Sequence, residues 1–247
     1  MESLDLKLKL LGGRPIYAKN FGDIYPLRIR DIIDVGYSEY MKYLNMIALD
    51  NSNLLKEAPD HMDTLELLLL GGGDEIVDLL LQSVSFFLRA EVYPDKENVG
   101  LIVTMTDGET RQINKMNYKE IQEIIKWQNY INHFDEKKGN EFDPADEETK
   151  NLKEQMDKLA KQRDELKRRK NRLDDEDNAN LDFFDILAAI TSKSYSINEI
   201  NMLDLTVFQV YRKFKRLEII DQYDISIQSM LAGAQNVQLR HWSSRDN

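Results

Sequence analysis

Residues 133–180 differ in composition from the rest of the chain, and this difference limits what the chain can fold into. Charged side chains dominate the stretch, and the apolar residues that could build a core are few. Apolar residues recur regularly on either side of it. We therefore predict an N-terminal domain at 1–132, a charged linker at 133–180 and a C-terminal helical module at 181–247.

Within the linker, residues 147–173 have the pattern of a long solvated helix. Leucines recur every seven residues, at Leu152, Leu159, Leu166 and Leu173. This spacing fits the d positions of a coiled-coil heptad, but the a positions include Arg163 and Lys170. Two charges on the seam predict a poor homodimer zipper. The acidic residues 174–180 are expected to end the helix.

The N-terminal domain is predicted to be α+β and mainly α, with small β elements packed on helices. Leucines alternate with polar residues over 4–10, which predicts a half-buried strand. Short strands are expected on both sides of a turn at 20–23, and Asp107-Gly108 predicts a hairpin over 99–113. Apolar residues three and four apart predict helices at 28–48, 60–70, 74–88 and 118–131.

The C-terminal module is predicted to contain two helices. A short amphipathic helix is expected over 183–190, and a longer one begins near Asp204. Gly233 is a natural exit for the longer helix, because glycine adopts the left-handed conformation at low cost. The tail, residues 235–247, is expected to be frayed.

Charge and composition exclude several classes of protein. The chain has 44 acidic and 33 basic side chains, a net charge of −11, which argues against a general nucleic-acid binder. It has no cysteine, so disulfides, thiol nucleophiles and Cys-ligated zinc are excluded. The N-terminus lacks the pattern of a signal peptide, and no apolar run approaches the ~20 residues of a membrane-spanning helix. We expect a soluble protein that stays in the compartment where it is made.

No catalytic constellation is visible in the sequence, and we predict that the chain is not an enzyme and uses no cofactor or metal. The three histidines are far apart and lack the spacing of metal ligands. The glycines at 71–73 lack the Walker spacing and its lysine, so we interpret them as a helix break. The acidic run 174–177 lacks the glycine and terminal glutamate of an EF-hand loop, so we interpret it as a solvated linker.

The basic run 161–172 allows two interpretations. It is either a patch for nucleic acid or an acidic partner, or a solvated helix face that pairs with acidic residues of the same chain. Acidic side chains interrupt the run and flank it, and no aromatic residue is present to stack on bases. These features favour the solvated face.

The apolar faces of the C-terminal helices are the best candidates for an interaction surface. The residues that we single out for partner binding are Phe183, Phe184, Leu187, Val207, Val210, Tyr211 and Phe214. Two interpretations stay open. Either these side chains pack together as the core of the module, or part of the surface awaits a partner, because a core in a segment of ~65 residues is marginal.

Two stretches, which together cover less than half of the chain, carry a recognisable pattern. The first is a short strand, Tyr25-Pro26, then a helix with Asp31-Ile32-Ile33 and a Tyr-rich face that continues through Tyr43-Leu44. It resembles the N-terminal part of small proteins encoded in the tail-gene clusters of phages and prophages of Gram-positive bacteria. The second joins residues 183–190 to a helix opening in Thr206-Val207-Phe208-Gln209, an Ala232-Gly233-Ala234 exit and a final Trp242. It is similar to the C-terminal part of phage tail assembly chaperones.

The resemblance implies a non-enzymatic role in the host cytoplasm. Such a chaperone binds the long, apolar tape measure protein, or another tail component, before the tail tube polymerises around it. The resemblance transfers surfaces rather than site residues, and it implies no cofactor. A structural virion protein and, less favoured, a nucleic-acid-associated regulator that uses 161–172 are the alternatives, and homo-oligomerisation stays open.

Overall fold

The computed structural model describes residues 4–49, 63–95, 98–131, 181–234 and 237–244. Residues 1–133 and 190–247 form one compact unit, and residues 134–189 form a second. The described part of the second unit, 181–189, contains the start of a helix that continues into the first unit. The predictions for 133–180, including the helix at 147–173 and the basic run, lie outside the described residues. The predicted domain boundaries stay predictions.

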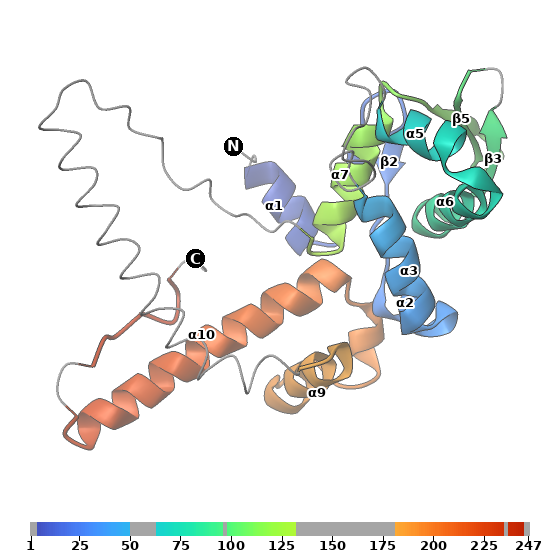
Figure 1. Ribbon diagram of the computed structural model, residues 1–247. Coiled ribbons are helices and arrows are strands. Elements are labelled where there is room, and N and C mark those ends of the chain that lie inside the picture. Colours follow the sequence, from blue (N-terminus) through green and yellow to red (C-terminus); the bar gives the residue numbers. More distant parts are fainter. Residues whose placement is uncertain (1–3, 50–62, 96–97, 132–180, 235–236, 245–247) are drawn as a thin grey trace, which may run out of the picture. The chain divides into compact units, whose positions relative to one another are not determined.

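The described residues form an α+β fold that is mainly α, as predicted (Figure 1). The helices are α1 (Leu4–Leu11), α2 (Ile29–Val35), α3 (Tyr37–Ala48), α5 (Thr64–Gly71), α6 (Gly73–Leu88), α7 (Tyr118–Gln128), α9 (Phe183–Lys193), the 3-10 helix η1 (Asn201–Asp204) and α10 (Val207–Leu231). The strands are β1 (Ile16–Ala18), β2 (Gly22–Ile24), β3 (Glu91–Asp95), β4 (Gly100–Thr104) and β5 (Thr110–Ile113). No helix in these described ranges is long and apolar enough to cross a membrane.

The strands form two small antiparallel sheets. Strands β1 and β2 make a hairpin in which Ile16 pairs with Ile24, which confirms the predicted turn between them. Strands β4 and β5 make the predicted hairpin, with Leu101 opposite Ile113. Gly108 has a φ of 84° in the connecting turn, a conformation that glycine adopts without strain. The hairpin at 99–113 is therefore confirmed.

Strand β3 was not expected from the sequence. It runs antiparallel to β4 at the edge of the three-stranded sheet, with Glu91 opposite Thr104. Pro94 hides it from a search for strand patterns, since proline is rare inside sheets. Proline is tolerated here because β3 is an edge strand, where one side of the backbone needs no ladder hydrogen bonds.

Helices α3, α6 and α7, with strands β4 and β5, enclose one part of the core of the first unit. Helix α3 packs on α6 and α7, and α6 packs on β3 (Figure 1). The side chains that fill this core are fully or nearly fully buried: Tyr40, Leu44, Ile47, Leu80, Val84, Phe87, Leu101, Val103, Ile113, Ile121, Ile124 and Ile125. The helix predicted at 118–131 is confirmed as α7, and its isoleucines at spacings of three and four supply the buried face.

Two buried glutamines of α7 hold neighbouring elements in place. The side-chain Nε2 of Gln122 donates hydrogen bonds to the carbonyl oxygens of Ile47 (2.7 Å) and Leu49 (2.6 Å), at the end of α3. The side-chain Nε2 of Gln128 donates to the carbonyl oxygen of Ile24 (2.9 Å), in strand β2. A buried carbonyl group without a hydrogen-bond donor lowers the stability of the fold. The two side-chain amides supply donors to the carbonyl groups at the end of α3 and in β2.

The prediction of a strand over 4–10 is wrong, because these residues form helix α1. In a helix, Leu6 and Leu10 are four residues apart and share one side, and Leu10 is buried. Leucine and lysine both favour helices, and the segment has no β-branched residue to favour a strand. Alternating leucines therefore fit two periodicities, and helix propensity decides between them.

The single helix predicted over 28–48 is also wrong in one respect. Gly36 has a φ of 91° and separates α2 from α3. This conformation is outside the helical region and is one that only glycine adopts easily. The chain therefore turns between the two helices, and their apolar faces need not be continuous.

We expect Gly100→Ala to lower the free energy of unfolding by about 2 kcal/mol. A Cβ at this position would lie 2.5 Å from the carbonyl oxygen of Ile113, which is paired backbone and cannot move aside cheaply. Gly71→Ala is the matched control, since a Cβ there has no atom within 4 Å. Urea unfolding of both variants measures the difference; equal stabilities would contradict the close approach of β4 and β5.

Candidate protein-binding surface

Helix α10 begins inside the first unit, where its first turn is held by hydrogen bonds. Thr206 and Gln209 form a capping box: the Gln209 amide donates to Thr206 Oγ1 (3.3 Å), and the Thr206 amide donates to Gln209 Oε1 (2.9 Å). The Ile29 amide donates to the Leu205 carbonyl (2.9 Å), and Gln209 Nε2 donates to the Leu11 carbonyl (2.8 Å). The start of α10 is thus joined to α1 and α2.

An ion-pair cluster lies beside this junction. The Asp204 carboxylate, at the end of η1, pairs with Arg28 (3.1 Å) and also with Arg30, at the start of α2. All three side chains are about half exposed, so water screens the pairs. We assign them a modest contribution to stability and a role in alignment.

Aromatic rings join α10 to the segment after α7. The rings of Tyr130 and Tyr211 stack with centroids 5.1 Å apart and an interplanar angle of 15°. Tyr130 also meets Phe208 edge-on, with centroids 5.8 Å apart. Burial raises the pKa of Tyr130 and of Tyr211 above the usual value for tyrosine, so both hydroxyls are neutral at physiological pH.

The seven residues predicted to bind a partner occupy different environments. Val207, Val210 and Leu187 are buried, whereas Phe183, Tyr211 and Phe214 are partly exposed. Phe184 is 74% exposed. The two valines are therefore core residues of the folded chain, because α10 packs against α1 and α7. Their side chains are 1% and 0% exposed, so in the folded chain they are not part of an exposed surface.

Further exposed apolar residues, not singled out from the sequence for partner binding, lie at the end of α10 and in the tail. Ile225 is 62% exposed and Leu231 is 84% exposed, in the last third of α10. Met230, Leu239 and Trp242 are each about half exposed. We call these five residues the C-terminal apolar surface. The three that belong to α10 carry a signal in the sequence: apolar residues lie on several sides of the helix end, a pattern usually found where a helix is covered.

The described part of the tail, 237–244, runs back along α10. Arg216 Nη1 donates to the carbonyl oxygens of Trp242 (2.9 Å) and Ser244 (2.9 Å). The His241 ring lies edge-on to the ring of Tyr223, which is about two turns after Arg216 in α10, with centroids 5.7 Å apart. Later tail residues thus contact earlier helix residues, so this part of the tail is ordered on α10 rather than frayed. Gly233 has a φ of 92° just after the end of α10, which confirms the helix exit predicted there.

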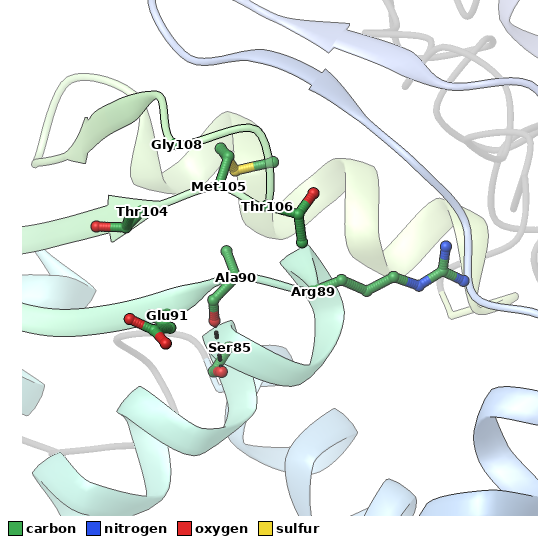
Figure 2. A pocket seen from close by; sticks show the side chains of 8 residues that line it. All are labelled: Ser85, Arg89, Ala90, Glu91, Thr104, Met105, Thr106 and Gly108. Atoms are coloured by element: carbon green, nitrogen blue, oxygen red, sulfur yellow. Dashed lines mark hydrogen bonds between the residues drawn. The ribbon is translucent and has the colours of Figure 1, made fainter.

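A pocket lies between the end of α6 and the β4–β5 hairpin (Figure 2). Its polar groups already have partners: Ser85 Oγ donates to the Ala90 carbonyl (2.6 Å), and Arg89 pairs with Asp31 of α2. Figure 2 shows the Arg89 side chain extending away from the other lining residues. The eight lining residues include no histidine that could activate a hydroxyl. The pocket therefore offers no assembled nucleophile and base.

Metal-binding groups do not gather within the described ranges. No set of three or more His, Asp or Glu side chains there could hold a metal ion. Of the three histidines, only His241 is described, and its Nδ1 lies 2.7 Å from Ser243 Oγ.

Comparison with known proteins gives one informative match. Residues 172–247 match the family model described as YomV second domain, a phage-derived family named after a protein of a Bacillus prophage. The match covers less than a third of the chain and includes α9, α10 and the tail. It suggests a phage protein. Neither the curated proteins nor the solved structures gave a match.

We expect Val210→Asp to lower the free energy of unfolding by more than about 3 kcal/mol, because it places a carboxylate in the core. Phe184→Asp changes a residue that is largely exposed, so its effect should stay within about 0.5 kcal/mol. Urea unfolding followed by circular dichroism measures both. A stable Val210→Asp variant would show that the start of α10 is not packed as described.

Proposed function

We propose that this chain is a non-enzymatic phage assembly protein that binds the tape measure protein, or another tail component, in the host cytoplasm. One observation carries the proposal. The segment that matches a phage-derived family also holds the C-terminal apolar surface. These exposed apolar side chains lie within one short segment of the chain, and apolar residues gathered on a surface often mark sites of protein interaction.

The physical properties of the C-terminal apolar surface support a helical partner. Ile225 and Leu231 are aliphatic and Trp242 is a large aromatic, a mixture typical of the centre of protein interfaces. An amphipathic helix of a partner would bury its apolar face against such residues. Tape measure proteins have long amphipathic helices of this kind, which aggregate when left bare.

The charge of the chain supports the same role. A net charge of −11 makes copies of the chain repel one another, which favours the solubility of the chain and of its complexes. The charged side chains of α10 lie before Ile225, whereas its last seven residues, 225–231, have none. An apolar end on a charged helix suits a protein that must bind an aggregation-prone chain and keep the complex in solution.

The proposal predicts that Ile225→Asp with Leu231→Asp weakens partner binding at least tenfold. Burial of each side chain would contribute about 1.5–3 kcal/mol to the free energy of binding. A loss of about 1.4 kcal/mol raises the dissociation constant tenfold. The test is co-expression with the tagged tape measure protein from the same phage genome, followed by affinity capture. Met116→Asp is the matched control, because Met116 is 80% exposed and lies before α7, outside the C-terminal apolar surface.

Three results would contradict the proposal. They are a wild-type chain that does not co-purify with the tape measure protein, a double variant that co-purifies as well as the wild type, and a double variant that has lost its helical circular dichroism. The last result would show that the two residues belong to the core.

The phage-derived match also fits a structural virion protein. Mass spectrometry of purified particles separates the two functions. A chaperone is absent from the particle, whereas a structural protein is present in a fixed copy number. The nucleic-acid alternative depends on the basic run at 161–172, and loss of DNA or RNA binding with rising salt would be its signature.

A further inference from the structure

Helix α1 has leucines on two sides, and one of these sides faces solvent. Leu10 is buried and Leu6 is partly buried, on the side toward the first unit. Leu4, Leu8 and Leu11 follow the spacing i, i+4, i+7 on the other side, and each is more than half exposed. A row of exposed leucines along one side of a helix is a candidate surface for binding another molecule.

The surroundings of this leucine row are basic, although the chain as a whole is strongly acidic. Residues 4–14 contain Lys7, Lys9 and Arg14 against one acidic residue, Asp5. Lys213 of α10 is one turn beyond Gln209, whose side chain bonds to Leu11, and it is exposed. We call Leu4, Leu8 and Leu11 with these basic residues the α1 surface.

The turn between α5 and α6 has the opposite charge. Leu70, in the last turn of α5, is 62% exposed, and Ile76, in the first turn of α6, is 41% exposed. Asp74, Glu75 and Asp78 lie beside Ile76 on α6 and are exposed. Residues 63–88 hold five acidic and no basic side chains. We call Leu70, Ile76 and these three acidic residues the α5–α6 corner.

The backbone of the corner allows another helix to approach closely. Cβ atoms at Gly71 and Gly73 would have no atom within 4 Å, so none of the residues that the structure describes covers the turn at these two glycines. The side chain of Ile76 lies over Gly72, since its Cγ2 would be 2.7 Å from a Cβ there. The corner is therefore a low, apolar surface with a carboxylate border.

We propose that the α1 surface of one copy of this chain binds the α5–α6 corner of a second copy. The two surfaces match in three respects: both are apolar, both belong to the ends or turns of helices, and their charges are opposite. Both are exposed in one copy, so each is left to engage another molecule. Since the two surfaces differ, the contact is heterologous and links copies head to tail into a ring or a filament.

This self-association involves neither Ile225 nor Leu231 and does not depend on the proposed function. A like-with-like pairing of α1 surfaces would place Lys7 and Lys9 near the same residues of the partner copy, and a pairing of corners would bring carboxylates together. Both are opposed by charge repulsion. An anionic membrane would attract the α1 surface but repel the α5–α6 corner, so the corner would then play no part.

Sedimentation velocity of the full chain tests the proposal. We expect the weight-average mass of the wild type to at least double over a concentration range of about two orders of magnitude. Leu8→Glu should make the chain monomeric, because it adds a carboxylate that faces the acidic corner. Ile76→Ser should do the same by removing the apolar contact of the corner. Met116→Ser, at an exposed apolar residue outside both surfaces, should associate as the wild type does.

Mixing the two monomeric variants gives the decisive result. The Leu8→Glu variant keeps an intact corner, and the Ile76→Ser variant keeps an intact α1 surface. Together they should form a one-to-one dimer that grows no further, since the remaining surfaces are both defective. A monomeric wild type, a mixture that stays monomeric, or loss of association in Leu8→Glu alone would overturn the proposal; the last outcome would point to symmetric pairing or to another ligand of α1. Circular dichroism confirms that each variant is folded.

Discussion

The packing of the start of α10 against the N-terminal elements is the constraint on which the rest of the structure depends. One backbone bond, from Ile29 to Leu205, ties α2 to the residue before the capping box of α10. The stacked rings of Tyr130 and Tyr211 add a second tie, from the end of α7. Residues more than 80 positions apart in the sequence are therefore part of one core. The segment that matches the family model is, in this chain, packed against the N-terminal elements at the first turn of α10.

This constraint divides α10 into two parts with different roles. Its first turn supplies Val207, Phe208 and Val210 to the core, and its last two turns carry Ile225 and Leu231 in solvent. A helix of 25 residues spans about 37 Å, so one end can be fixed while the other presents apolar residues. An anchored helix loses little conformational freedom when a partner binds its free end, which favours affinity. The proposed function relies on this division.

The sequence predicted local structure well where the spacing of apolar residues fitted only one type of secondary structure. The isoleucines of α7 and the Asp107-Gly108 turn gave the correct helix and hairpin, since each signal is local. Leu4 to Leu10 misled because the alternation of leucines and the helix propensity of leucine and lysine disagree, and the alternation was given too much weight. Gly36 misled because a single glycine does not show whether a helix continues or turns.

The candidate surface was less predictable, for a different physical reason. Spacing shows which face of α10 is apolar but not which neighbour covers it, so Val210 and Ile225 look equivalent in the sequence. The elements on which α10 packs, α7 and α1, lie about 80 to 200 residues earlier in the chain than Val210. The distribution of charge was easier to predict, because the sequence shows directly that residues 4–14 are mainly basic and residues 63–88 are acidic. The exposure of the apolar side chains beside those charges is known only from the structure.

Native-state hydrogen exchange of the full chain tests the division of α10 most directly. The account predicts that the amides of Ile29 and Val210 exchange only through global unfolding, with the same protection as the Ile121 amide in α7. The Ala232 amide, which bonds to Gln228 at the free end, should exchange far faster. If Val210 instead exchanged as fast as Ala232 while Ile121 stayed protected, the C-terminal helix would open on its own, and the start of α10 would not belong to the core.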